Sequence, residues 1–203
     1  MPSPERWLAM WHTLGGRPQR QLYDEVVARY SEPHRHYHTA RHLDECFAHW
    51  DDIGQLATHP AEVALALWFH DAIYEPRRDD NEERSADWAR ASAIAAGVPT
   101  ASADRVHALV MATRHDALPG SVDQQVLVDI DFAILGAPPA RFDEYERDVR
   151  AEHAWVPDFL FRAKRKEILQ AFLARPAIYH SAPMRERLEA QARANLARSL
   201  AKP

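Results

Sequence analysis

The chain has 203 residues, of which 46% are hydrophobic and 27% are charged, a composition typical of a folded globular protein. Its formal net charge of −5 provides no general cationic surface, so we expect no nucleic-acid polymer as a partner. A single cysteine, Cys46, excludes an intramolecular disulfide framework and a multi-cysteine zinc module. Because the N-terminus lacks a signal-peptide pattern and the longest apolar stretch is too short for a bilayer, we expect a cytoplasmic protein with no membrane contact.

Apolar residues recur at helical spacing along most of the chain, and glycines or prolines separate the periodic segments. No turn dipeptide of the Asn-Gly type lies between alternating apolar runs, so the sequence shows no β-hairpin signal. The predicted helices cover approximately residues 7–14, 18–30, 39–56, 60–71, 82–96, 103–113, 122–135, 141–154, 157–174 and 183–200. We therefore predict one all-α domain over residues 1–203, in which the C-terminal helices (about 140–200) pack on the core.

The most informative stretch is the apolar run that ends in the adjacent pair His70 and Asp71. An imidazole and a carboxylate are costly to bury unless they are hydrogen-bonded, paired or bound to a metal. Neighbouring helical residues point roughly 100° apart, so both side chains reach one ion only beside the end of the helix. Taken alone, the pair is more often a satisfied core histidine next to a capping carboxylate.

Two further segments carry residues of the same chemistry. His38 and His42 are spaced i and i+4, which places both imidazoles on one helical face, and we expect one of them to be a metal ligand. Asp129 and Asp131 lie in an apolar helix two residues apart, so at most one of them faces the same way as the apolar stripe. Each segment also has an ordinary explanation, a surface histidine in one case and a capping or solvated acid in the other.

Together these residues form the order His, His-Asp, Asp on separate predicted helices. This order resembles the HD superfamily of metal-dependent phosphohydrolases, which are helical bundles. Five sequence blocks extend the similarity to a bacterial subgroup of predicted HD phosphohydrolases, over about residues 7–196. They are HYHTARHL (36–43), WFHDAIY (68–74), DNEERSA (80–86), ATRH (112–115) and LVDIDFAILG (127–136).

The resemblance implies four metal ligands, which are His38, His70, Asp71 and Asp131. His38 is preferred to His42 because an arginine follows it three residues later, and Asp131 is preferred to Asp129 because small and apolar residues follow it. Many family members carry a glutamate shortly after the His-Asp pair. In this chain Tyr74 stands near that place with Glu75 beside it, so Glu82 or Glu83 becomes the candidate general acid or base.

The implied activity is metal-dependent hydrolysis of a phosphate ester or anhydride in a small phosphorylated molecule such as a nucleotide. One divalent ion (Mn, Fe, Co, Ni or Mg) suits the mixed nitrogen and oxygen ligands. The candidate catalytic residues are Asp71, Glu82, Glu83 and His115, and the candidate substrate-binding residues are Arg35, Arg41, His42 and Tyr74. The alternative is an HD-like protein that binds a metal or nucleotide for regulation without catalysis. Tryptophans such as Trp7 and Trp11 suit either a core or the interface of a homodimer.

Overall fold

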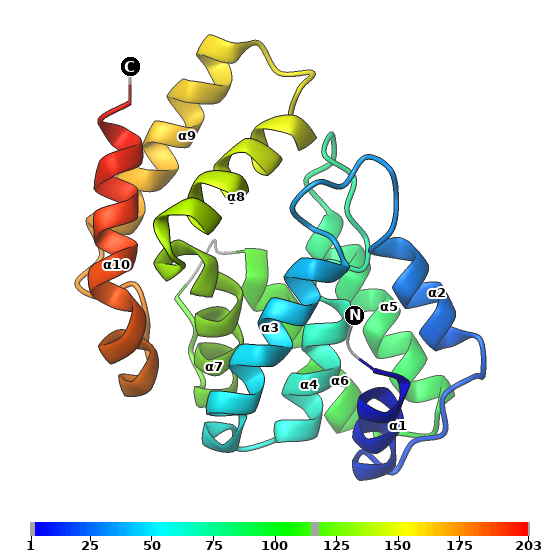
Figure 1. The fold of residues 1–203 in the computed structure, drawn as a ribbon. Coiled ribbons are helices and arrows are strands. Elements are labelled where there is room, and N and C mark those ends of the chain that lie inside the picture. Colours follow the sequence, from blue (N-terminus) through cyan, green and yellow to red (C-terminus); the bar gives the residue numbers. More distant parts are fainter. Residues whose placement is uncertain (1–2, 115–117, 203) are drawn as a thin grey trace. The chain divides into compact units, whose positions relative to one another are not determined.

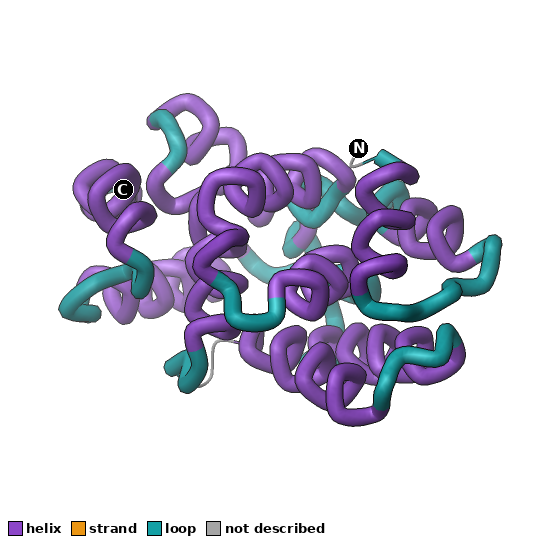
Figure 2. Tube along the Cα trace, turned by 90° about the horizontal axis from the view of Figure 1, so that it is seen from below, coloured by secondary structure: helices purple, strands orange, loops and turns teal. Residues whose placement is uncertain are grey.

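A computed structural model describes residues 3–114 and 118–202. Within these residues the chain forms ten α-helices and three short 3₁₀ segments, with no strand (Figure 2). This confirms the predicted all-α fold class. The chain contacts divide it into two compact units, residues 1–130 and 131–203, and each unit is described by itself. The predicted packing of the C-terminal helices on the rest of the chain stays a prediction.

The first unit is organised around a buried helix, α4 (Pro60–Phe69), which packs against α1, α3, α5 and α6 (Figure 1). Every side chain from Glu62 to Phe69 is buried, so this part of α4 has no solvent-facing side and is apolar nearly all round. The other helices of this unit are α1 (Pro4–Thr13), α2 (Leu22–Arg29), α3 (Ala40–Ile53), α5 (Asn81–Ala95), α6 (Thr100–Met111) and α7 (Val122–Asp131), the last residue of which opens the second unit.

Local sequence explains where α4 starts and stops. Pro60 occupies its first turn, where the missing backbone N–H costs nothing. The one charged residue, Glu62, is buried but accepts two hydrogen bonds, of 2.7 and 2.6 Å, from the guanidinium of Arg105. At the other end, the Tyr30 hydroxyl donates to the carbonyl of Trp68 at 3.0 Å, which satisfies an acceptor left over by the helix. The helix ends with His70 at its C-cap, as the sequence predicts.

The second unit consists of a short 3₁₀ segment, η3 (Phe132–Gly136), and the helices α8 (Pro139–Glu152), α9 (Asp158–Leu173) and α10 (Ala182–Leu200). The amide of Asn195 on α10 donates to the carbonyls of Leu135 and Ala137, at 2.9 and 2.8 Å. A Cβ on Gly136 would lie 2.6 Å from the Cβ of Leu188, so only glycine allows this close approach to α10. These contacts hold η3 against α10, whereas Leu169 is the one buried residue among those that form α9.

Predicted and observed helices differ mainly at their ends. The second predicted helix begins at about Pro18, but α2 begins at Leu22, because the backbone N–H of Arg17 donates to the carbonyl of Ala96 and holds this segment outside the helix. Three predicted helices, 39–56, 103–113 and 122–135, each divide into an α-helix and a tighter 3₁₀ segment. These are α3 with η1 (Gly54–Leu56), α6 with η2 (Ala112–Arg114) and α7 with η3. Trp7 and Trp11 lie in the core of the first unit. Among the described residues, no helix has the length and apolar character needed to cross a membrane.

Candidate metal centre

The candidate site lies where α4 ends against the first turn of α3. His70 is 1% exposed, and its Nδ1 lies 2.8 Å from the carbonyl oxygen of Leu67. A carbonyl oxygen can only accept, so Nδ1 carries the proton and the Nε2 atom of the neutral ring keeps its lone pair. Backbone carbonyls orient metal-binding histidines in the same way. The C-terminal turn of α4 thus prepares His70 as a ligand.

Two other polar atoms converge on His70 Nε2. The Oδ2 atom of Asp71 lies 3.0 Å away and the Nε2 atom of His42 lies 3.1 Å away. The distance between His42 Nε2 and Asp71 Oδ2 is 3.4 Å. An imidazole nitrogen binds a divalent transition metal at about 2.0–2.1 Å, which places neighbouring ligands of one ion roughly 3.0–3.4 Å apart. The three atoms therefore have the spacing of one face of a coordination sphere, and they could hold a metal ion.

Asp71 is ionised in this setting. Burial alone would raise the pKa of its carboxyl group. The positive charge of the His70 and His38 imidazoles in their protonated forms, and hydrogen bonds from His42 and from protonated His70, hold that pKa well below its usual range. The carboxylate therefore keeps the charge that a cation requires.

Arg35 positions the segments that carry these ligands. Its side chain is fully buried, and its guanidinium donates to the carbonyls of His38 at 3.0 Å, Asp71 at 2.6 Å and Ala72 at 3.1 Å. Its Nε also donates to the carboxylate of Glu32 at 3.1 Å. The predicted role of Arg35 is contact with substrate phosphate. The observed contacts instead favour a positioning role, because each nitrogen already donates to an acceptor within the fold.

The structure places His42 beside His70, whereas the predicted ligand from this segment is His38. His42 lies in the first turn of α3 and is buried beside His70, whereas His38 precedes α3 and is half-buried. The His38 ring stacks on Tyr74 at a centroid distance of 4.1 Å, and its centroid lies 6.1 Å from that of His42. The group of neighbouring ligand atoms contains His42 and not His38. The geometry thus favours His42 as the ligand from this segment and places His38 with Tyr74 at the edge of the site.

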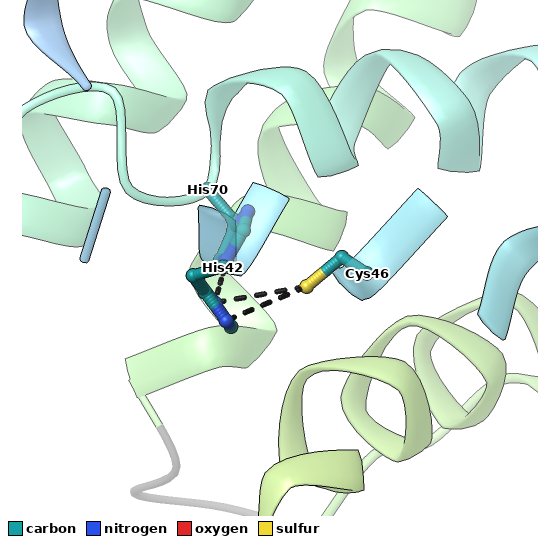
Figure 3. A group of neighbouring side chains, drawn as sticks. All are labelled: His42, Cys46 and His70. Atoms are coloured by element: carbon teal, nitrogen blue, oxygen red, sulfur yellow. Dashed lines mark hydrogen bonds between the residues drawn. The ribbon is translucent and has the colours of Figure 1, made fainter. Parts of the chain in front are cut away.

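Cys46 is a neighbour of the site that sequence reasoning overlooked. One helical turn after His42 on α3, it is buried, and its Sγ lies 3.6 Å from His42 Nε2 and 3.8 Å from His42 Nδ1 (Figure 3). Its thiol forms a second group of mutually close ligand atoms with His42 and His70, which also belong to the group that contains Asp71. The i, i+4 spacing of His42 and Cys46 in the sequence could have predicted that the two side chains lie on one face of the helix.

The loop after Asp71 is fastened to the start of α5 by two side chains. Asn81 accepts from the backbone N–H of Glu75 and donates to the carbonyl of the same residue, both at 3.0 Å. Ser85 Oγ accepts from the N–H of Ile73 at 3.0 Å and donates to its carbonyl at 3.3 Å. Sequence reasoning singled out the acids of this block, but its asparagine and serine hold the loop.

The remaining predicted site residues that the structure describes lie on α3, α5 and α7. Glu82 is half-buried and Glu83 is exposed, both in the first turn of α5. Arg41 is exposed and pairs with Glu45 at 3.3 Å. Asp129 is fully buried in α7, whereas Asp131 ends α7 and is the first residue of the second unit, so its ligation stays a prediction. His115 lies outside the described residues.

Comparisons with protein-family models, with curated proteins and with solved structures found no match.

Proposed function

We propose that the chain is a metal-dependent phosphohydrolase acting on a small phosphorylated molecule. One observation carries the proposal: the Nε2 lone pair of His70 points to the place where His42 Nε2 and Asp71 Oδ2 converge, within 3.0 to 3.4 Å of one another. The resemblance of the sequence blocks to HD phosphohydrolases supplies the expected reaction. When bound, a divalent ion supplies Lewis acidity that polarises a phosphoryl group and activates water.

The protein residues have separate tasks in this proposal. His42, His70 and Asp71 hold the ion, and the free oxygen of the ionised Asp71 carboxylate accepts a hydrogen bond from the attacking water and so orients it. Arg41 presents an exposed guanidinium suited to a phosphate oxygen. Arg35 keeps the backbone of Asp71 in place. The fourth predicted ligand, Asp131, and the candidate acids Glu82 and Glu83 belong to the proposal as predictions.

A non-catalytic metal-binding regulatory protein is the second candidate. The position that often carries a glutamate in HD hydrolases is held here by Tyr74, whose ring stacks on His38. Glu75 beside it is exposed, and its backbone is bonded to Asn81. The first carboxylate after the His-Asp pair is thus that of an exposed residue, Glu75, which favours binding without turnover.

Elemental analysis of protein purified without chelators or a metal-binding tag tests the site first. We expect about one divalent ion per chain, lost in the double variant His70→Ala, Asp71→Ala. The single variant Asp71→Asn keeps the side-chain shape and should also lose the ion. It tests the site in case the double variant does not fold. His107→Ala removes a histidine paired with Asp87 at 3.3 Å, outside the cluster, and should retain the ion.

Hydrolysis assays on nucleoside mono-, di- and triphosphates with Mn, Co, Ni and Mg then separate the two candidates. Turnover that is lost in Asp71→Asn and kept in His107→Ala supports the hydrolase. Metal binding without turnover of any of these substrates would leave the regulatory protein. A wild-type chain that takes up no metal, even after incubation with Mn, Co and Ni, would contradict both.

A further inference from the structure

The second unit contains a cavity of about 880 Å³ formed by α8, α9 and the C-terminal end of α10. This volume lies in the range of small-molecule binding sites. Phe161 and Leu169 of α9 contribute apolar surface to it, and Leu169 is the residue that anchors α9 in its unit. The cavity is formed entirely by residues of the second unit, whereas His42, His70 and Asp71 belong to the first.

Positive charge dominates the walls of this cavity. Six cationic side chains and three carboxylates line it, although the whole chain has a formal charge of −5. The carboxylates are already engaged: Asp143 pairs with Arg198 and Lys202, Glu146 with Arg165, and Asp158 with Arg150 and Arg162. Little acidic surface is left to neutralise further cations.

Two cations of the cavity have no partner within the described residues. Arg147 on α8 and Lys166 on α9 are both exposed, and neither side chain makes an ion pair or hydrogen bond with any residue that the structure describes. Lys166 also lies one turn after Arg162, an i, i+4 arrangement of like charges that destabilises a helix. An anion between α8 and α9 would remove this repulsion and use both free cations.

We propose that this cavity binds a phosphorylated small molecule carrying a diphosphate group. Arg147 and Lys166 donate to the phosphoryl oxygens from helices α8 and α9, and the remainder of the molecule contacts Phe161 and Leu169. A guanidinium and an ammonium are the usual phosphate donors of proteins, and charge-assisted hydrogen bonds to them are among the strongest. The proposal is independent of the metal centre, because it uses only residues of the second unit.

Isothermal titration calorimetry with inorganic pyrophosphate on the full chain tests the site. The protein is first freed of metal with a chelator and desalted, so that a metal-bound phosphate cannot contribute. We expect saturable binding that weakens with added salt. The double variant Arg147→Ala, Lys166→Ala should bind at least roughly tenfold more weakly, because two charge-assisted contacts are lost.

Lys164→Ala is the matched control. Lys164 is on the same helix and is exposed, but it pairs with Glu167 and does not line the cavity. Its loss should change the affinity for pyrophosphate less than about twofold, the effect of one distant charge. Circular dichroism of each variant reports whether the helices are intact, which the exposure of all three residues leads us to expect.

Three results would overturn the proposal. They are no saturable binding to the wild-type chain, equal weakening in Lys164→Ala and in the double variant, or loss of pyrophosphate binding in Asp71→Asn. The last result would assign the anion to the metal centre. Conversely, pyrophosphate binding to a wild-type chain that takes up no metal and hydrolyses no substrate would support the cavity while the hydrolase proposal fails.

Discussion

Helices α4 and α9 both contain many apolar residues, but they are used in opposite ways. From Val63 to Phe69, α4 has no charged residue and every side chain is buried. In α9 charged residues interrupt the apolar ones, Leu169 alone is buried, and Phe159 is 72% exposed. The comparison shows how each helix supports a site: α4 holds its C-cap residue, His70, within a core, whereas α9 presents most of its side chains to solvent.

The two candidate sites likewise differ in burial and in how their charges are compensated. At the end of α4, the charge of Asp71 is balanced by neighbouring imidazoles, because an isolated buried charge would be too costly. In the second unit, Arg147 on α8 and Lys166 on α9 remain uncompensated among the described residues, which solvent exposure allows. A preorganised, buried donor set suits a metal ion, and an open cationic cavity suits an anion.

The largest expected difference between the two helices is in stability. Leu67→Ala in α4 removes a fully buried side chain and should lower the free energy of unfolding by roughly 2–5 kcal/mol through lost burial and a residual cavity. Leu160→Ala in α9 removes a side chain that is 50% exposed and should cost less than about 1 kcal/mol. Urea unfolding followed by circular dichroism measures both. Similar losses in the two variants would contradict the contrast between α4 and α9.

Arg35→Ala should be nearly as damaging, by roughly 3 kcal/mol, because it leaves three carbonyls and the Glu32 carboxylate without their donor. Metal affinity should fall with it, since the backbone of Asp71 loses its support. Arg29→Ala removes the other arginine paired with Glu32, but this pair is exposed and should contribute less than about 1 kcal/mol. Full metal content and wild-type stability in Arg35→Ala would show that the arginine is dispensable for positioning.

Ser85→Ala should cost about 1–2 kcal/mol, because the part-buried backbone N–H and carbonyl of Ile73 lose their partner, the hydroxyl of the buried Ser85. The loop after Asp71 should loosen, and the dissociation constant for Mn²⁺ should rise. Ser92→Ala, on the same helix, has no such contact with the loop and should leave both quantities unchanged. An unaltered Mn²⁺ affinity in Ser85→Ala would show that the loop does not control the metal centre.

The smallest effect concerns the second unit and depends on pH. Hydrogen bonds from Arg198 and Lys202 hold the pKa of the Asp143 carboxyl below its usual value. A carboxyl whose pKa is lower in the folded chain stabilises it above the unfolded pKa, about 3.9, and loses this contribution as the pH falls through the folded pKa. Asp143→Asn should therefore be less stable than wild type at pH 7, by less than about 1 kcal/mol. The difference should shrink in acid, and a constant difference across pH would contradict this account.

Sequence periodicity predicted most helices to within a few residues, because apolar spacing and glycine or proline breaks are local signals. It also placed His70 and Asp71 at the end of a buried helix, since an unbroken apolar run has no solvent-facing side. It did not distinguish His42 from His38. Both lie on one predicted helical face, but α3 begins only at Ala40, so the rings occupy different environments.

The role of Arg35 also could not be predicted from local sequence. Its charge predicted an exposed phosphate ligand, whereas its long side chain reaches backbone carbonyls at residues 71 and 72, which are distant in sequence. Cys46 likewise had no predicted role, although its sulfur lies against His42.

By itself, the sequence determined the all-α class, the central helix and the position of the His70 and Asp71 pair at its end, because these follow from patterns within a few turns of chain. The tertiary structure decided which histidine joins that pair, which arginine supports it and where free cations gather around a cavity. These depend on side chains from separate helices meeting at distances near 3 Å, and helical periodicity carries no information on how separate helices are placed.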